Sequence, residues 1–296
     1  MGSDFELIVM AGTEQEAAPF LEAGIQEIKR LETLLTEFNE QSDTGQINAH
    51  AGIKPVKVAP EVFQLIQRCL HLSALTQGAF DITAGTLKAL YPFKRPEQAL
   101  PDPLTIKEAL VKTGYRHIRL QEPQEVFLQQ QGCRIGFGAI GKGYAADCVK
   151  RLWQKAGVAS GVVNASGDLT AWGTQADEQP WKIGIAHPDD PEHILLWLPL
   201  DNASVATSGN YIQYLDIDGV RYSHNIDPRT GRPARFLKSV TVIGPSAELS
   251  DALATAVTIM GIEAGFNLVD QIPQVHAIVI DENNQVHTSS KIKAHA

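Results

Sequence analysis

Apolar residues recur at helical spacing along the first part of the chain. Between residues 14 and 38 they fall every three to four positions, for example at Leu21, Ile25 and Ile28, with charged residues between them. This spacing predicts one long amphipathic helix, preceded by a short strand at 5–10. A strand around Val56 and a second helix over 61–75 are predicted to follow.

Short β-prone runs separated by turn residues are typical of the rest of the chain. Strands are predicted within 117–137 and at 162, 181–186, 194–198 and 276–280. A hairpin is predicted from 211–217 and 220–225, joined by Asp218-Gly219. Helices are predicted from the glycine cluster at 136–143 to about Lys155, and over 248–260 and 263–269.

The grouping of these elements indicates the fold class. Strands that form hairpins, with helices set apart, favour an α+β fold with mixed, largely antiparallel sheets and flanking helices. Residues 5–290 are expected to form a single domain of two intimate lobes. Segment 91–103 holds four prolines and predicts a surface loop rather than a domain linker.

Composition narrows the choice of partners. Hydrophobic residues make up 44% of the chain and charged residues 20%, as in an ordinary globular protein. The formal net charge is −9 and no Lys/Arg run exceeds a pair, so no nucleic-acid partner is expected. An anionic ligand would need local neutralisation by a metal, a helix N-terminus or a few cations. No apolar stretch is long enough to predict a transmembrane segment.

The three cysteines show no metal-site or redox spacing. Cys69, Cys133 and Cys148 lie in predicted helix, strand and helix contexts, without a close CxxC pair. We expect them to be small buried hydrophobic residues.

The glycine cluster resembles two known nucleotide-binding loops. Gly136-Phe137-Gly138-Ala139-Ile140-Gly141 has GxGxxG spacing, but it lies mid-chain and the next suitable acid, Asp168, comes late for a Rossmann unit. With Lys142-Gly143 the segment is one residue from a Walker A loop, yet Gly143 replaces the hydroxyl residue that would hold magnesium. Taken alone, a phosphate-binding loop and a tight turn with a surface lysine explain it equally well.

Two other groups of polar residues are candidates for a site. Segments 207–210 and 222–233 combine hydroxyls, His224, Asp227 and two arginines around Asp-Pro and Thr-Gly turns, which favours a functional loop. Asp251 and Thr255, four residues apart in a predicted helix, share one face and would offer two hard oxygen ligands to magnesium. Taken alone, they are better explained by an acid near a helix N-terminus and an inward-packed threonine.

In this order, the blocks of the sequence resemble the ApbE-like family of FAD:protein FMN transferases. The resemblance covers residues 5–287. The matching blocks are Phe38-x3-Ser42-Asp43-x3-Ile47-Asn48, Gly78-Ala79-Phe80-Asp81-Ile82-Thr83, Gly138-Ala139-Ile140-Gly141-Lys142-Gly143-Tyr144-Ala145, Asn164-Ala165-Ser166-Gly167-Asp168, Ala206-Thr207-Ser208-Gly209-Asn210-Tyr211, His224-x-Ile226-Asp227-Pro228-x-Thr230-Gly231-x-Pro233 and Asp251-Ala252-Leu253-Ala254-Thr255-Ala256.

The resemblance implies a magnesium-dependent enzyme that cleaves FAD at its pyrophosphate and releases AMP. FMN would then be joined to a Ser/Thr hydroxyl of an acceptor flavoprotein. The residues that match FAD contacts are Phe38, where the family usually has Tyr, Ala79, Phe80, Asp81, Lys142 and Ile226. The residues that match metal ligands are Asp251, Thr255 and, through its backbone carbonyl, Ala139. His224 matches the catalytic residue and could accept the proton of the attacking hydroxyl.

Two positions depart from the family pattern. Gly136 stands where the family usually carries an Asp that contacts FAD, so Gly136→Asp is expected to strengthen FAD binding. Ser166 replaces a usual Gly. The alternatives are an FAD pyrophosphatase, a flavin-binding module without catalysis and, more distantly, a P-loop nucleotidase.

The start of the chain is relevant to the cellular compartment of the protein. Residues 1–4 are expected to be a cloning remnant, which is compatible with removal of a native export signal, so the lack of a secretion signal pattern does not decide the compartment. By analogy with family members that serve respiratory flavoproteins, the cell envelope is favoured over the cytoplasm.

Overall fold

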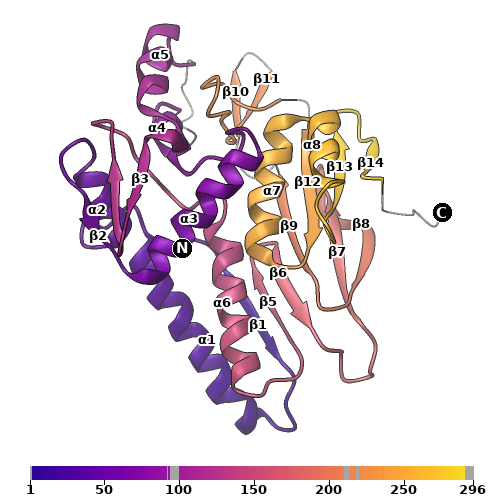
Figure 1. The fold of residues 1–296 in the computed structure, drawn as a ribbon. Coiled ribbons are helices and arrows are strands. Elements are labelled where there is room, and N and C mark those ends of the chain that lie inside the picture. Colours follow the sequence, from indigo (N-terminus) through magenta and orange to yellow (C-terminus); the bar gives the residue numbers. More distant parts are fainter. Residues whose placement is uncertain are drawn as a thin grey trace. The chain divides into compact units, whose positions relative to one another are not determined.

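The computed structural model describes residues 2–91, 93, 100–209, 214–217, 220–235 and 237–290. The chain forms two compact units (Figure 1). Unit 1 contains Met1–Glu32, Ile140–Tyr211 and Leu237–Ala296, and unit 2 contains Thr33–Ala139 and Ile212–Phe236. Each unit is therefore assembled from segments that are distant in sequence.

The described part of unit 1 is built on a seven-stranded antiparallel sheet (Figure 1). Its strands, in spatial order, are β1 (Phe5–Val9), β5 (Gly161–Ala165), β6 (Asp168–Trp172), β9 (Ser204–Gly209), β12 (Leu237–Gly244), β13 (His276–Asp281) and β14 (Val286–Thr288). All five residues of β6 are buried, so this strand lies inside the unit. A separate hairpin pairs β7 (Trp181–His187) with β8 (Asp190–Leu200).

Helices α6 (Gly141–Lys155) and α7 (Ala247–Met260) pack on this sheet and on each other. Helix α6 lies against β5 and β6, and α7 lies against β9 and β12. Leu253 and Val257 of α7 join the core with Val240 and Val242. Helix α8 (Ile262–Val269) follows after Gly261, whose φ of 81° ends α7.

Unit 2 combines short helices with small antiparallel sheets. Strands β2 (Val56–Lys57), β4 (Glu125–Leu128) and β3 (Ile118–Gln121) form one sheet, and β10 (Tyr214–Ile217) pairs with β11 (Val220–Ser223). The helices are α2 (Asp43–Ala49), α3 (Pro60–Leu75), α4 (Gly85–Lys88) and α5 (Pro103–Lys112), with 3-10 turns at Ile82–Ala84 and Tyr115–His117. Leu87, Tyr91, Ala109, Tyr222 and Ile226 form one of its buried clusters.

The long helix α1 (Glu14–Leu35) begins in unit 1. Its residues Phe20, Leu21 and Ile28 pack on a cluster that contains Trp153 of α6. The predicted end of this helix at 38 was three residues too late.

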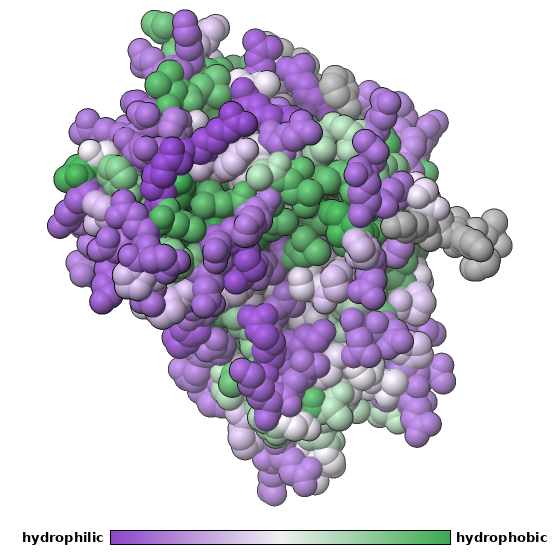
Figure 2. Space-filling model, viewed as in Figure 1, coloured by the Kyte–Doolittle hydropathy of each residue, from purple (hydrophilic) through white to green (hydrophobic). Residues whose placement is uncertain are grey.

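No helix among the described residues has an apolar run long enough to span a membrane. Polar residues cover most of the face shown in Figure 2, with apolar residues gathered over one part of it.

The fold class predicted from the sequence is confirmed. Every strand pairing among the described residues is antiparallel, unlike the parallel sheets of Rossmann and P-loop proteins. The cysteines are buried, as expected, but Cys133 lies in an irregular segment rather than a strand. The predicted turn at 218–219, residues 211–213 and most of the proline-rich segment fall outside the described residues.

Candidate functional site

The first turn of α6 packs unusually closely on the first turn of α7. A Cβ atom at Gly143 would lie 2.2 Å from the carbonyl oxygen of Ala247, so a side chain at this position would force the helices apart. The close approach lets the Gly143 N–H donate to Oδ2 of Asp251 over 3.2 Å. The N-cap residue of α6, Ile140, has an apolar side chain that cannot accept a hydrogen bond. Gly143 thus permits helix packing at the position where a Walker A loop would need a hydroxyl.

A buried carboxylate also joins the two helices. Asp147 of α6 accepts the N–H of Ala247 at Oδ1 (3.1 Å) and that of Glu248 at Oδ2 (2.9 Å). The first N–H groups of a helix have no partner within the helix, so Asp147 satisfies two of them for α7. Burial raises the pKa of Asp147, and these two hydrogen bonds oppose the rise. The role of this residue could not be predicted, because its only signal in the sequence is a single acid between Ala146 and Cys148.

Three charged side chains meet in unit 1, one from each of three elements. The Nζ atom of Lys142 on α6 bonds to Oδ2 of Asp168, the first residue of β6. The other oxygen of Asp168 accepts the N–H of Thr207 over 3.2 Å. Asp168 and Asp251 are only 2% and 6% exposed. The structure therefore brings Lys142 and Asp251, both predicted, together with Asp168, which was matched only as part of a motif.

The electrostatics of this cluster favour an added cation. Burial raises the pKa of Asp251 well above its usual value, nearby Asp168 raises it further, and Lys142 opposes the rise. Burial likewise raises the pKa of Asp168 despite its bond to Lys142. Burial would lower the pKa of Lys142, but the two carboxylates raise it, so this side chain is a cation. Two buried carboxylates share one ammonium group, which leaves one negative charge, and a bound divalent ion would more than offset it.

The other predicted metal ligands supply oxygen atoms of the kind magnesium binds. Thr255 is half-buried and lies one helical turn after Asp251 on the same side of α7. Ala139 lies in the turn just before α6, three residues before Lys142, and could contribute its backbone carbonyl. Carboxylate, hydroxyl and carbonyl oxygens are hard ligands, so this donor set fits Mg²⁺.

The predicted flavin contacts of unit 2 differ in accessibility. Ala79 and Phe80 are 0% and 1% exposed as whole residues, so both their side chains and their backbone are covered in this structure. Asp81 is 8% exposed and caps the turn Ile82–Ala84. Phe38, in contrast, is 91% exposed in the loop before α2. An exposed aromatic ring of this kind suits stacking on a planar ligand.

His224 begins a tightly closed loop. It is half-buried directly after β11, and Ile226, 4% exposed, forms a β-bridge with Pro233. The backbone carbonyl of Asp227 accepts N–H bonds from Thr230 (3.2 Å) and Gly231 (2.8 Å). The turn signature therefore folds into a defined loop that carries His224. The hydroxyls of Thr207 and Ser208, grouped with this loop in the sequence analysis, belong to β9 of unit 1 instead.

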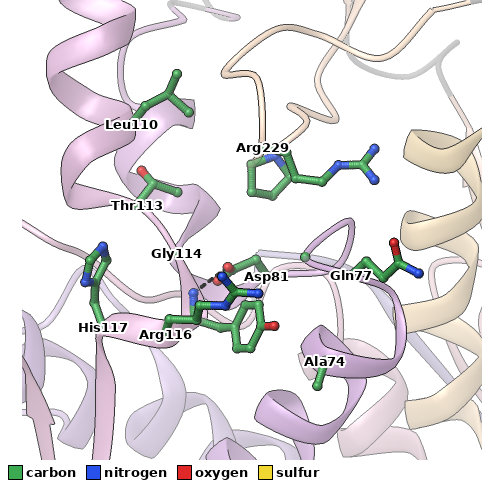
Figure 3. Close-up of a pocket in the computed structure, with 12 residues that line it drawn as sticks. Ala74, Gln77, Asp81, Leu110, Thr113, Gly114, Arg116, His117 and Arg229 are labelled. Atoms are coloured by element: carbon green, nitrogen blue, oxygen red, sulfur yellow. Dashed lines mark hydrogen bonds between the residues drawn. The ribbon is translucent and has the colours of Figure 1, made fainter.

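A cavity of about 770 Å³ opens beside this loop within unit 2 (Figure 3). Its walls come from the end of α3, the end of α5, the turn Tyr115–His117 and the pair Pro228-Arg229. Of the predicted site residues, Asp81 lines it. Arg116 and His117 also line it, although no sequence motif marks them.

A carboxylate lies beside the glycine that departs from the family pattern. A Cβ atom at Gly136 would be 2.9 Å from Oε1 of Glu37. Glu37 directly precedes Phe38, so this acid and the exposed ring lie on the same loop. The space beside Gly136 is thus already occupied by a carboxylate. In the Gly136→Asp variant the new side chain would lie next to it.

Comparison with known proteins gives a consistent assignment. The family model of the ApbE family matches residues 1–279. An FAD:protein FMN transferase of Treponema pallidum is 32% identical over 281 residues, which cover 90% of this chain and 78% of that protein. The crystal structure of the ApbE protein of Thermotoga maritima superposes with a TM-score of 0.90 at 32% identity, covering 98% of this chain and 94% of that one. The flavinyl transferase ApbE of Pseudomonas stutzeri superposes with a TM-score of 0.86 at 29% identity, covering 98% and 92%.

Proposed function

The chain belongs to the ApbE family, and from this premise we propose that it is an FAD:protein FMN transferase. The reaction breaks the pyrophosphate bond of FAD on the FMN side and releases AMP. A new phosphoester bond joins FMN to a Ser/Thr hydroxyl of an acceptor flavoprotein, and the hydroxyl proton is taken up by a base. Residues 5–290 act as one catalytic domain in this proposal.

The observation that best supports the proposal is the buried cluster of Lys142, Asp168 and Asp251 at the start of α6. Phosphoryl transfer depends mainly on positioning and on neutralising charge that develops on phosphate oxygens. Lys142 supplies one fixed positive charge, and the N-terminus of α6 directs further N–H groups toward an anion. Asp251, Thr255 and the carbonyl of Ala139 would hold Mg²⁺. This ion, when bound, would polarise the pyrophosphate and stabilise the leaving phosphate.

The remaining residues have roles in binding and proton transfer. His224, held by the closed loop of residues 224–234, takes the proton of the acceptor hydroxyl as that oxygen attacks phosphorus. Phe38 stacks on the flavin ring with its exposed face. Ala79, Phe80, Asp81 and Ile226 form the flavin-side wall, and each of them is at most 8% exposed.

The proposal is tested by AMP release from FAD with magnesium and with EDTA. Asp251→Asn keeps the shape of the side chain and removes its charge, so we expect AMP release to fall by about 100-fold or more. Binding of Mn²⁺ as a spectroscopic substitute, followed by electron paramagnetic resonance, should weaken in parallel. The matched control is Glu263→Gln, which removes an exposed carboxylate from α8 and should leave both measurements unchanged. Full AMP release by Asp251→Asn would refute the metal assignment.

A further inference from the structure

Gly136 occupies a backbone position that is fixed by hydrogen bonds to other segments of unit 2. Asn48 of α2 binds both backbone groups of Ile135: its Nδ2 donates to the carbonyl over 2.9 Å, and its Oδ1 accepts the N–H over 2.7 Å. The N–H of Gly136 donates to the carbonyl of Ile82 over 2.9 Å. A group that packs against Gly136 therefore lies against a well-anchored part of the unit.

The carboxylate of Glu37 packs against this glycine. Oε1 of Glu37 lies 2.9 Å from the position that a Cβ atom would take at Gly136, and Oε2 lies 3.9 Å from the equivalent position at Gly85. The shorter of these distances is too small for a carbon and an oxygen that are not bonded, so a side chain at 136 would compete with the carboxylate for space. Gly136 thus leaves room for an acidic group that comes from another loop.

Glu37 has no partner for its carboxylate within the described part of the chain. No hydrogen bond or ion pair there reaches it, and its charge interacts with that of Lys88 without an ion-pair contact. Other acids of unit 2 are bound by the protein itself: Oδ2 of Asp43 accepts the N–H of Ala59 over 2.7 Å, and Asp81 caps a turn. The half-buried carboxylate of Glu37 is thus an acceptor that a ligand could use.

Glu37 lies close in the chain to both ends of the proposed flavin site. It directly precedes Phe38, the exposed ring that is proposed to stack on the flavin. Its carboxylate contacts Gly136, three residues before Ala139, whose carbonyl is proposed to hold the metal at the phosphates. Three residues span at most about 11 Å, so Gly136 is no farther than this from Ala139. Glu37 is therefore placed beside the part of a flavin nucleotide that joins the ring to the phosphate.

The chemistry of a carboxylate suits that part of the ligand. The ring and the phosphate of a flavin nucleotide are joined by the ribityl chain, which carries hydroxyl groups. A carboxylate can only accept hydrogen bonds, so it binds O–H or N–H donors and repels phosphate oxygens. Hydrogen bonds from hydroxyls to a carboxylate are charge-assisted and are among the stronger ones in proteins.

We propose that Glu37 accepts hydrogen bonds from the ribityl hydroxyls of the bound flavin nucleotide and makes the site specific for flavins that carry this chain. The inference rests on the proposed function, because it takes Phe38 as the contact of the flavin ring. Lys142 and the proposed magnesium site serve the phosphates, whereas Glu37 serves the neutral chain between ring and phosphate. A site with an acceptor matched to a hydroxyl discriminates strongly against an analogue that lacks the hydroxyl.

The test compares two flavins that differ only in this chain. Riboflavin carries the ribityl chain without a phosphate, and lumiflavin carries a methyl group in its place. Binding of each flavin to the protein is followed by the quenching of flavin fluorescence. Glu37→Gln keeps the size of the side chain and removes its charge. We expect this variant to bind riboflavin about tenfold more weakly than the parent chain, and lumiflavin equally well.

Two further variants make the result specific to this carboxylate. Glu40→Gln removes an exposed acid from the same loop and should bind both flavins as the parent chain does. Gly136→Asp, added to Glu37→Gln, returns a carboxylate to the space beside residue 136 and should restore riboflavin binding.

Three results would overturn the inference. Equal riboflavin binding by the parent chain and Glu37→Gln would show that the carboxylate does not contact the ligand. Equal weakening of riboflavin and lumiflavin would place the carboxylate at the flavin ring. Weaker binding of AMP, measured by calorimetry, with unchanged binding of riboflavin would place it at the adenosine half of FAD.

The same preparations separate this inference from the proposed function. AMP release from FAD with magnesium is measured for the parent chain alongside the flavin titrations. A parent chain that neither binds flavin nor releases AMP would refute the proposed function. A parent chain that does both, with the same riboflavin affinity in Glu37→Gln, would refute only the role of Glu37.

Discussion

Asp147 on α6 accepts the N–H of Ala247, the first residue of α7, over 3.1 Å. With the bond from Glu248, this contact ties the helix that carries Lys142 to the helix that carries Asp251. Two elements that are about a hundred residues apart in sequence are thus fixed at the proposed metal site.

Replacing Asp147 by Asn should therefore impair the site without touching a proposed ligand. Asn has one acceptor oxygen, so one buried N–H at the start of α7 would lose its partner at a cost of about 1–3 kcal/mol. We expect a higher magnesium concentration for half-maximal AMP release, because Asp251 is no longer held against Gly143.

The control for this variant is Ser246→Ala. Ser246 caps the same helix by accepting the N–H of Leu249, and it is not a link to α6. Its loss should cost about 1 kcal/mol in stability and leave the magnesium requirement of the folded protein unchanged. Equal magnesium requirements in both variants would show that Asp147 is only a helix cap.

Gly143→Ala should destabilise the protein. The new Cβ would meet backbone atoms of Ala247, which cannot move aside as a flexible side chain can. We expect a loss of about 1–3 kcal/mol in the free energy of unfolding, measured by denaturant titration. Gly138→Ala, in the same loop, has no atom within 4 Å of its added Cβ and should leave stability unchanged. Equal stabilities for both variants would contradict the close helix packing.

The structure revises the expected effect of Gly136→Asp. The new side chain would lie beside the carboxylate of Glu37, and two like charges at this distance repel. We now expect the single variant to bind FAD no more tightly than the parent chain. The double variant Gly136→Asp with Glu37→Gln should bind FAD about tenfold more tightly than the single one. Calorimetry in EDTA measures both, and tighter binding by the single variant would refute the role given to Glu37.

The buried cysteines should resist modification in the folded protein. Burial raises the pKa of Cys133 to about 12, and nearby Asp81 adds to the rise. Because the reactive form is the thiolate, only roughly one molecule in ten thousand is reactive at pH 8. Cys69 and Cys133 should react with a thiol reagent only after denaturation, as peptide mass mapping would detect. Rapid labelling of either in the native state would contradict their burial.

The sequence predicted the helices of unit 1 well because their apolar spacing is regular. The face shared by Asp251 and Thr255, and the core face with Leu253, follow directly from helical periodicity. The role of Asp168 was harder to predict. Its position depends on the tight turn at Ser166 and Gly167, both with positive φ, and on packing against α7, which comes much later in the sequence.

Other features could not be predicted because they depend on contacts between distant segments. Strands β9 and β12 lie side by side with a helix packed on them, yet no local pattern in the sequence indicates their order in the sheet. The cavity of unit 2 joins Arg116 and Arg229 from segments more than a hundred residues apart, and neither lies in a motif that specifies a pocket. Helix α2 was missed because it is short and polar.

The most direct test of the account is the intact mass of an acceptor domain from a flavinylated protein, measured after incubation with the chain, FAD and Mg²⁺. We predict that the acceptor gains the mass of one phosphoester-linked FMN, that an equal amount of AMP appears, and that both are lost in EDTA and with Asp251→Asn. AMP release without a gain in acceptor mass would instead identify a pyrophosphatase. FAD binding with neither product would contradict catalysis at the Lys142–Asp251 site.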